Sequence, residues 1–107
     1  MALELTNDNF NKVVKEFEGL VLIDFWAAWC GPCQMIAPVI EELSKEFKGN
    51  EKVKICKLNV DDNQELAQEY GVMSIPVLKF FKGGEAVDEI VGMQSKEVIV
   101  SKLNQLQ

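Results

Sequence analysis

The hydrophobic pattern of this chain changes period several times. Short apolar runs, typical of buried strands, alternate with segments whose apolar side chains recur at intervals of three and four residues, typical of amphipathic helices. The runs predict strands over residues 2–5, 21–26, 53–60, 77–81 and 85–91. The longer periods predict helices through 10–17, over 32–47 and 64–70, and from a cap at Ser95 through 106.

Turn and cap residues support these boundaries. Gly83-Gly84 predicts a hairpin between the last two strands, and Asp62 with Glu65 three residues later resembles a capping box. Pro38 lies within the longest helical pattern and should kink it. The order of elements predicts an α/β fold with parallel crossover connections and a final antiparallel hairpin. A length of 107 residues suits a single domain over 1–107.

The strongest candidate for chemistry is the pair Cys30 and Cys33, placed where the 21–26 strand leads into a helix. Residues three apart on a helix lie roughly 5–6 Å apart, which suits the Cα separation of a disulfide. Unpaired N–H groups and the helix dipole should stabilise a thiolate at Cys30, which we expect to face solvent as the more reactive thiol. Gly31 would allow a tight turn, and Pro32 fits the first helical turn, where a missing N–H costs little.

Asp24 is the second candidate, because its strand is otherwise apolar on both sides. We interpret it as a buried carboxylate with a raised pKa that can accept a proton from Cys33. The alternative is a carboxylate at a strand end with a polar partner. Lys57, from a neighbouring strand, would face Asp24 and modulate it.

Composition narrows the possible functions. A net charge of −6 and a pI of about 4.6 argue against nucleic acid and anionic membranes as partners. No apolar run is long enough to span a bilayer, and the first residues lack the pattern of a signal peptide. The chain has three cysteines and no histidine, which excludes Cys–His catalysis and any zinc site with a histidine ligand.

A zinc site built on Cys30 and Cys33 would need two further ligands, and only Cys56 remains among cysteine and histidine residues. One working pair and one spare thiol suit a reducing compartment, so we expect a cytoplasmic protein. Cys56 is expected to pack in the core as a small hydrophobic side chain, and Met35 to pack rather than react.

The dithiol and Asp24 belong to a longer ordered pattern. Its stretches are Asp24-Phe25-Trp26, Trp29-Cys30-Gly31-Pro32-Cys33, Met35-Ile36-Ala37-Pro38, Lys57-Leu58-Asn59-Val60-Asp61, Ser74-Ile75-Pro76, Phe81-Lys82-Gly83-Gly84 and Val91-Gly92. This pattern resembles the thioredoxin family across essentially the whole chain. The resemblance implies a five-stranded mixed central sheet flanked by four helices, and a thiol–disulfide oxidoreductase that reduces protein disulfides and donates electrons.

The same resemblance implies roles for individual residues. Cys30 would attack the substrate, and Cys33, helped by Asp24, would resolve the product and close the Cys30–Cys33 disulfide. Pro76 would be cis and packed against that disulfide. The other implied roles are redox tuning by Gly31, Pro32 and Lys57, a substrate groove of Trp29, Ile75, Pro76, Gly92 and Met93, and structural support by Trp26 and Pro38.

The resemblance also implies that the protein binds no cofactor or metal and acts as a monomer. Its expected partners are disulfide-containing proteins and a thioredoxin reductase that supplies electrons from NADPH. Four residues depart from the commoner family pattern and leave the redox potential and partner preference open: Ala28, Gln34, Val77 and Met93.

Two other functions compete with this interpretation. The first is a disulfide oxidant or isomerase of the same fold; the Gly31-Pro32 dipeptide disfavours it, because such relatives commonly carry a histidine between the cysteines. The second is a non-enzymatic binding module, in which the fold serves as a scaffold.

Overall fold

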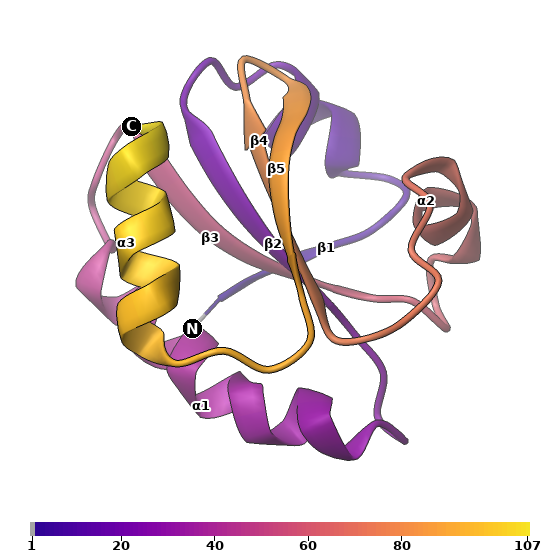
Figure 1. The fold of residues 1–107 in the computed structure, drawn as a ribbon. Helices are drawn as coiled ribbons and strands as arrows, with labels where there is room; N and C mark the ends of the chain where they lie inside the picture. Colours follow the sequence, from indigo (N-terminus) through magenta and orange to yellow (C-terminus); the bar gives the residue numbers. More distant parts are fainter. Residues whose placement is uncertain (1) are drawn as a thin grey trace.

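A computed structural model describes residues 2–107 of the chain (Figure 1). Strands and helical segments follow one another in the predicted order. Along the chain these are β1 (Leu3–Leu5), the π-helical turn η1 (Asn11–Lys15), β2 (Leu20–Trp26), α1 (Gly31–Glu46), β3 (Val53–Asn59), α2 (Gln64–Glu69), β4 (Val77–Lys82), β5 (Glu85–Val91) and α3 (Lys96–Leu106).

The strands form one five-stranded mixed sheet in the order β1-β3-β2-β4-β5, which confirms the predicted fold class. β3 runs parallel to β1 and β2, whereas β4 runs antiparallel to β2 and β5. The long crossover through α1 returns the chain in the same direction after β2, and the short turn at Gly83-Gly84 reverses it after β4. β2 therefore lies at the centre of the sheet, with its carboxyl end leading into α1.

Helical segments cover both faces of the sheet, with α1 and α3 on one face and η1 and α2 on the other (Figure 1). Successive side chains of β2 point to opposite faces of the sheet: Leu22 packs with α1 and α3, and Ile23 packs with η1 and α2. β3 divides in the same way, with Ile55 on the α1 face and Cys56 on the opposite face. Burial on both faces explains why β2 reads as a nearly continuous apolar run.

The start of α2 differs from the prediction. Its N-cap is Asn63, without a side-chain cap hydrogen bond, so the capping box of Asp62 and Glu65 is wrong. The Asn63 side chain accepts a hydrogen bond from the Asn7 N–H at 3.0 Å and donates one to the Asn59 carbonyl at 3.0 Å. A contact between segments 56 residues apart has taken the place of a local cap.

Two helices also differ in extent. The first predicted helix is a single π-helical turn of five residues. α1 begins at Gly31, one residue earlier than predicted, and continues through Pro38 to Glu46. Pro38 lies on the exposed side of α1, where its ring meets solvent rather than the sheet.

The β4–β5 turn packs against the segment that precedes β2. The Gly83 N–H donates to the Glu18 carbonyl at 3.2 Å. Gly84 has a positive φ of 82°, and a Cβ at this position would lie 2.5 Å from the Lys15 carbonyl oxygen. Backbone conformation and close packing both require glycine at this position.

Candidate active site

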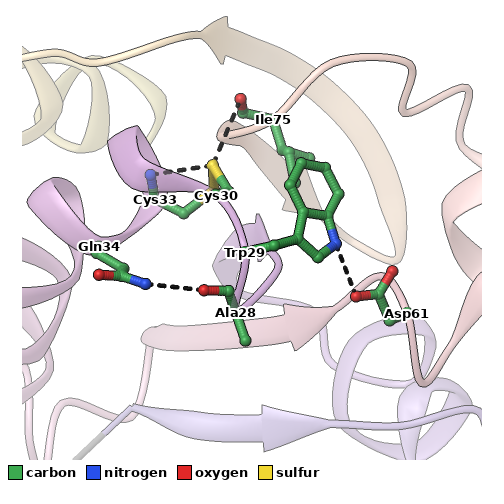
Figure 2. Close-up of a disulfide and its surroundings, with 7 residues drawn as sticks. All are labelled: Ala28, Trp29, Cys30, Cys33, Gln34, Asp61 and Ile75. Carbon is green, nitrogen blue, oxygen red and sulfur yellow. Dashed lines mark hydrogen bonds between the residues drawn. A yellow bond between two sulfur atoms is a disulfide. The ribbon is translucent and has the colours of Figure 1, made fainter.

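Cys30 and Cys33 form a disulfide at the start of α1, with their Cα atoms 5.2 Å apart (Figure 2). Cys30 is the N-cap of α1, and its Sγ accepts a hydrogen bond from the Cys33 backbone N–H at 3.1 Å. The predicted closure of the pair within one helical turn is confirmed. The first turn also directs an otherwise unpaired N–H at the Cys30 sulfur, which favours negative charge on that atom.

Exposure does not distinguish the two cysteines. Cys30 is 4% exposed and Cys33 is 2% exposed, so the expectation that Cys30 faces solvent is wrong for the disulfide form. The two sulfurs differ instead in their neighbours. Cys30 Sγ lies 3.8 Å from the carbonyl oxygen of Ile75, whereas Cys33 lines a small cavity beneath α1.

Gly31 and Pro32 occupy the first turn of α1, but only the proline has the predicted conformational role. Pro32 lies within the first two helical positions, where its missing N–H breaks no helical hydrogen bond. Gly31 lacks a positive φ, and a Cβ there would meet nothing within 4 Å. The turn therefore does not need a glycine for its backbone shape, contrary to our prediction.

The cavity beneath α1 has a volume of about 110 Å³ and brings together Asp24, Cys33, Glu41 and Lys57. Asp24 is 3% exposed and pairs in register with Lys57 of β3. Burial raises the pKa of the Asp24 carboxyl to about 7; the positive charge of Lys57 opposes this rise and the negative charge of Glu41 adds to it.

Within residues 2–107, Asp24 Oδ1 is buried without a hydrogen-bond partner. This oxygen has no polar partner of the kind that the alternative, a strand-end carboxylate with a polar partner, requires. The predicted raised pKa and the predicted facing of Asp24 by Lys57 are both confirmed.

Glu41 is a residue of this cavity that the sequence analysis missed. Its Oε2 lies 3.5 Å from Lys57 Nζ, and its Oε1 accepts a hydrogen bond from the Ala2 N–H at 2.9 Å. Glu41 follows Cys33 by eight residues, about two turns along α1. That spacing was the signal that could have revealed it.

A second group of predicted residues lies on the outer side of the disulfide. Trp29 is 70% exposed, and its indole N–H donates to Asp61 Oδ2 at 2.9 Å (Figure 2). Asp61 was matched as part of a family stretch but was not predicted to contact the site. The hydrogen bond holds the indole over the loop that follows β3.

The segment before β4 approaches the same side. Ile75 packs against the buried cluster of Ala27, Cys30 and Cys33. The Ile75-Pro76 peptide bond is cis, as the resemblance implied. The Gly92 N–H donates to the Pro76 carbonyl at 2.9 Å, which brings the end of β5 beside this segment. Met93 follows and is 40% exposed.

The remaining predicted residues lie further from the disulfide or have other surroundings. Trp26 lines the cavity and is half-buried, and Lys57 Nζ lies 5.9 Å from the centre of its ring. Pro38 does not line the cavity. Met35 is 67% exposed, so the prediction that it packs is wrong. Cys56 is fully buried, as predicted.

Among residues 2–107, no group of three or more histidine, cysteine, aspartate or glutamate side chains is arranged to hold a metal ion. Over the same residues, no helix combines the length and the apolar character that crossing a membrane requires.

Comparisons with known proteins agree over almost the full length. The thioredoxin family model matches residues 1–105. Thioredoxin from Bacillus subtilis is 56% identical over 87 residues, covering 81% of this chain and 82% of the relative. Thioredoxin from Rickettsia felis is 47% identical over 104 residues, 97% of each chain, and thioredoxin from Synechocystis sp. is 47% identical over 100 residues, 94% and 92% respectively.

Proposed function

This chain belongs to the thioredoxin family and is a thiol–disulfide oxidoreductase of the thioredoxin type, and from this we propose that it reduces protein disulfides with separate roles for Cys30, Cys33 and Asp24. The observation that carries the proposal is the asymmetry of the two sulfurs. Cys30 Sγ accepts the Cys33 backbone N–H, whereas Cys33 shares a cavity with the buried Asp24 carboxyl.

In the first step, the Cys30 thiolate attacks one sulfur of a substrate disulfide. A bond forms between Cys30 Sγ and that sulfur, and the other substrate sulfur leaves as a thiolate. The Cys33 N–H supports this step because it stabilises charge on Cys30 Sγ before the attack.

In the second step, Cys33 resolves the mixed disulfide. Its thiol gives a proton to the Asp24 carboxylate, and the resulting thiolate attacks Cys30 Sγ and displaces the second substrate thiolate. Two electrons have then passed to the substrate, and the protein holds the Cys30–Cys33 disulfide. Burial raises the pKa of Asp24 to about 7. This value supports the role, because a general base works best when its pKa lies near the ambient pH.

We propose that the cycle is completed by a thioredoxin reductase that draws electrons from NADPH, with no cofactor bound to this chain. A dithiol on that partner would reduce the Cys30–Cys33 disulfide by the same exchange chemistry in reverse. Cys56 remains a thiol while the other two cysteines are paired, and this combination supports a reducing compartment such as the cytoplasm.

The proposed docking surface for the substrate comprises Trp29, Ile75, Pro76, Gly92 and Met93. Trp29 and Met93 present exposed apolar surface on the outer side of the disulfide, and an extended segment of substrate could lie against them. Gly31, Pro32 and Lys57 are proposed to tune the redox equilibrium, with Trp26 and Pro38 in supporting roles. We further propose that the chain acts as a monomer and that residues 1–107 form one domain.

The test of the proposal is a Cys33→Ser variant incubated with a disulfide-containing protein such as insulin. Without the resolving thiol, the first step should leave Cys30 joined to substrate, and a non-reducing gel should show an adduct that dithiothreitol releases. Cys30→Ser is the matched control and should form no such adduct. Turnover of Cys33→Ser at the wild-type rate would refute the two-step mechanism.

A further inference from the structure

Glu41 lies in the same cavity as two of the residues that the proposed second step uses. It lies on α1 and lines the cavity that also holds Asp24 and Cys33. Its carboxylate is 3.5 Å from Lys57 Nζ, and Lys57 is the register partner of Asp24. The side chains of Lys57 and Glu41 are 23% and 31% exposed, so their ion pair is partly removed from water.

We propose that Glu41 is a positioning residue that holds the Lys57 ammonium away from Asp24 and thereby sets how readily Asp24 accepts the proton of Cys33. The proposal rests on the function proposed above, in which Asp24 is the base for the resolving thiol. It adds a residue that neither the sequence motif nor the contacts of the disulfide identify.

The charged surroundings of Asp24 are few. From β3 it faces Lys57, and from α1 it faces Glu41 and Cys33. From β4 its register partner is the apolar Leu78, which packs in the cluster shared with α1 and α3. Lys57 and Glu41 are thus the charges that determine the electrostatics of this cavity within the described residues.

Two opposing effects follow from this arrangement. A free Lys57 ammonium beside Asp24 would favour the carboxylate and weaken it as a base. By pairing with Lys57, Glu41 draws part of this positive charge toward itself, and its own negative charge also favours protonated Asp24. The only atom transferred in the step is the Cys33 proton, which moves from sulfur to an Asp24 oxygen.

Glu41→Gln tests the inference, because glutamine keeps an oxygen that can accept the Ala2 N–H while removing the charge. Glu42→Gln is the matched control: Glu42 is the next residue on α1, makes the same change in net charge, and pairs with Lys96 instead. In oxidised protein with ¹³C-labelled aspartate, the carboxyl shift of Asp24 should titrate at a midpoint lower by about half a pH unit or more in Glu41→Gln. It should be unchanged in Glu42→Gln.

Comparing Glu41→Gln in a Lys57→Gln background separates an effect that acts through Lys57 from direct repulsion between the Glu41 and Asp24 carboxylates. There, the effect of Glu41→Gln on the Asp24 midpoint should shrink to less than half its size in the wild-type background. An undiminished effect would overturn the role assigned to Lys57. Equal midpoints in Glu41→Gln and wild type would overturn the inference as a whole.

The rate of mixed-disulfide resolution, followed by stopped flow across pH, distinguishes this inference from the proposed function. If Glu41→Gln lowers the Asp24 midpoint, the acid limb of the rate profile should move to lower pH by the same amount. A shifted midpoint with an unmoved rate profile would refute Asp24 as the base for Cys33, and with it the catalytic consequence drawn here for Glu41.

Discussion

Two regions of this molecule hold cysteine side chains that are almost equally hidden from solvent, yet their chemistry differs. At the start of α1, Cys30 and Cys33 are 4% and 2% exposed and are joined as a disulfide. In the middle of β3, on the η1 and α2 face of the sheet, Cys56 is fully buried and free. Burial raises the pKa of the Cys56 thiol to about 12, although the positive charge of Lys54 opposes the rise.

The two regions differ in the local polar groups around the sulfurs, and from this we expect different reactivities. In a strand interior, backbone N–H groups are used by neighbouring strands, so Cys56 has no donor to stabilise a thiolate. At a helix start, N–H groups are unpaired, and one of them points at Cys30 Sγ. Near-complete burial is thus compatible with either an inert or a reactive cysteine.

The largest predicted effect separates the two regions by activity. Cys30→Ser should lose at least about a thousandfold in insulin reduction, because no other thiol is placed to form the mixed disulfide. Cys56→Ala should keep activity within about twofold of wild type. Activity that fell equally in both variants would show that the β3 thiol takes part in the reaction. That result would contradict the difference expected between the two regions.

The next effect concerns Asp24 and the free energy of unfolding. Because the pKa of Asp24 is raised from 3.8 to about 7, the native protein binds its proton more tightly than the unfolded chain does. The resulting destabilisation is absent below pH 3.8, grows as pH rises, and is complete above about 7. Asp24→Asn should therefore be more stable than wild type by roughly 4 kcal/mol at pH 8, with the advantage vanishing in acid.

Urea denaturation of both proteins at several pH values measures this difference, and mixed-disulfide resolution by Asp24→Asn should be slower in parallel. Oxidised protein should be used for the stability series, so that no active-site thiol titrates. A variant less stable than wild type at pH 8 would mean that Asp24 is stabilised by partners, contrary to its buried and unpaired Oδ1.

A smaller effect is expected in alkylation rates. In reduced native protein at pH 7, iodoacetamide should label Cys30 about a hundredfold or more faster than Cys56, because one sulfur receives an N–H and the other is a buried neutral thiol. Peptide mapping after brief exposure gives the ratio. Labelling in denaturant is the control and should equalise the rates. Predominant early labelling of Cys33 or Cys56 would contradict the assignment of Cys30 as the attacking thiol.

The smallest predicted effect is the packing contribution of Cys56. Cys56→Ala should lower the free energy of unfolding by about 1–2 kcal/mol, since it removes a sulfur from a closely packed cluster. Thermal or urea unfolding at pH 7 measures this loss. No measurable destabilisation would show that the cluster closes around the smaller side chain.

Much of the fold could be predicted because the spacing of apolar residues and the positions of turn and cap residues are local properties of the sequence. The two-faced burial of β2 is visible in its apolar run, and the hairpin at Gly83-Gly84 is visible in its turn residues. The cap of Ser95 was also correct, since its side chain accepts the Val98 N–H. The capping box predicted for α2 was wrong, because the N-cap is Asn63 and its side chain accepts a hydrogen bond from the distant Asn7 N–H instead.

The same distinction applies to the candidate site: residues marked by a local pattern were predicted, and residues placed by tertiary packing were not. The C-x-x-C spacing, the start of a helix and a charged residue in an apolar strand are all local, and they led to Cys30, Cys33 and Asp24. The contacts of Glu41 and Asp61 depend on how α1 and the loop after β3 pack against the rest. The spacing of Glu41 from Cys33 placed it near the same side of α1 but did not show that it reaches Lys57, and no local pattern distinguished Asp61 from other surface acids. The exposure of Met35 depends likewise on which side of α1 meets the sheet.

Two of the glycine-containing turns differ in how well they would tolerate an engineered peptide insertion. Gly84 lies with its backbone against Lys15, so added residues there would have to displace η1. Gly49, between α1 and β3, also has a positive φ, but a Cβ there would meet nothing within 4 Å. A displayed epitope or a fused peptide is therefore better placed after Gly49 than at Gly84, because Gly49 lies beyond the carboxyl end of α1, at the opposite end of that helix from the disulfide.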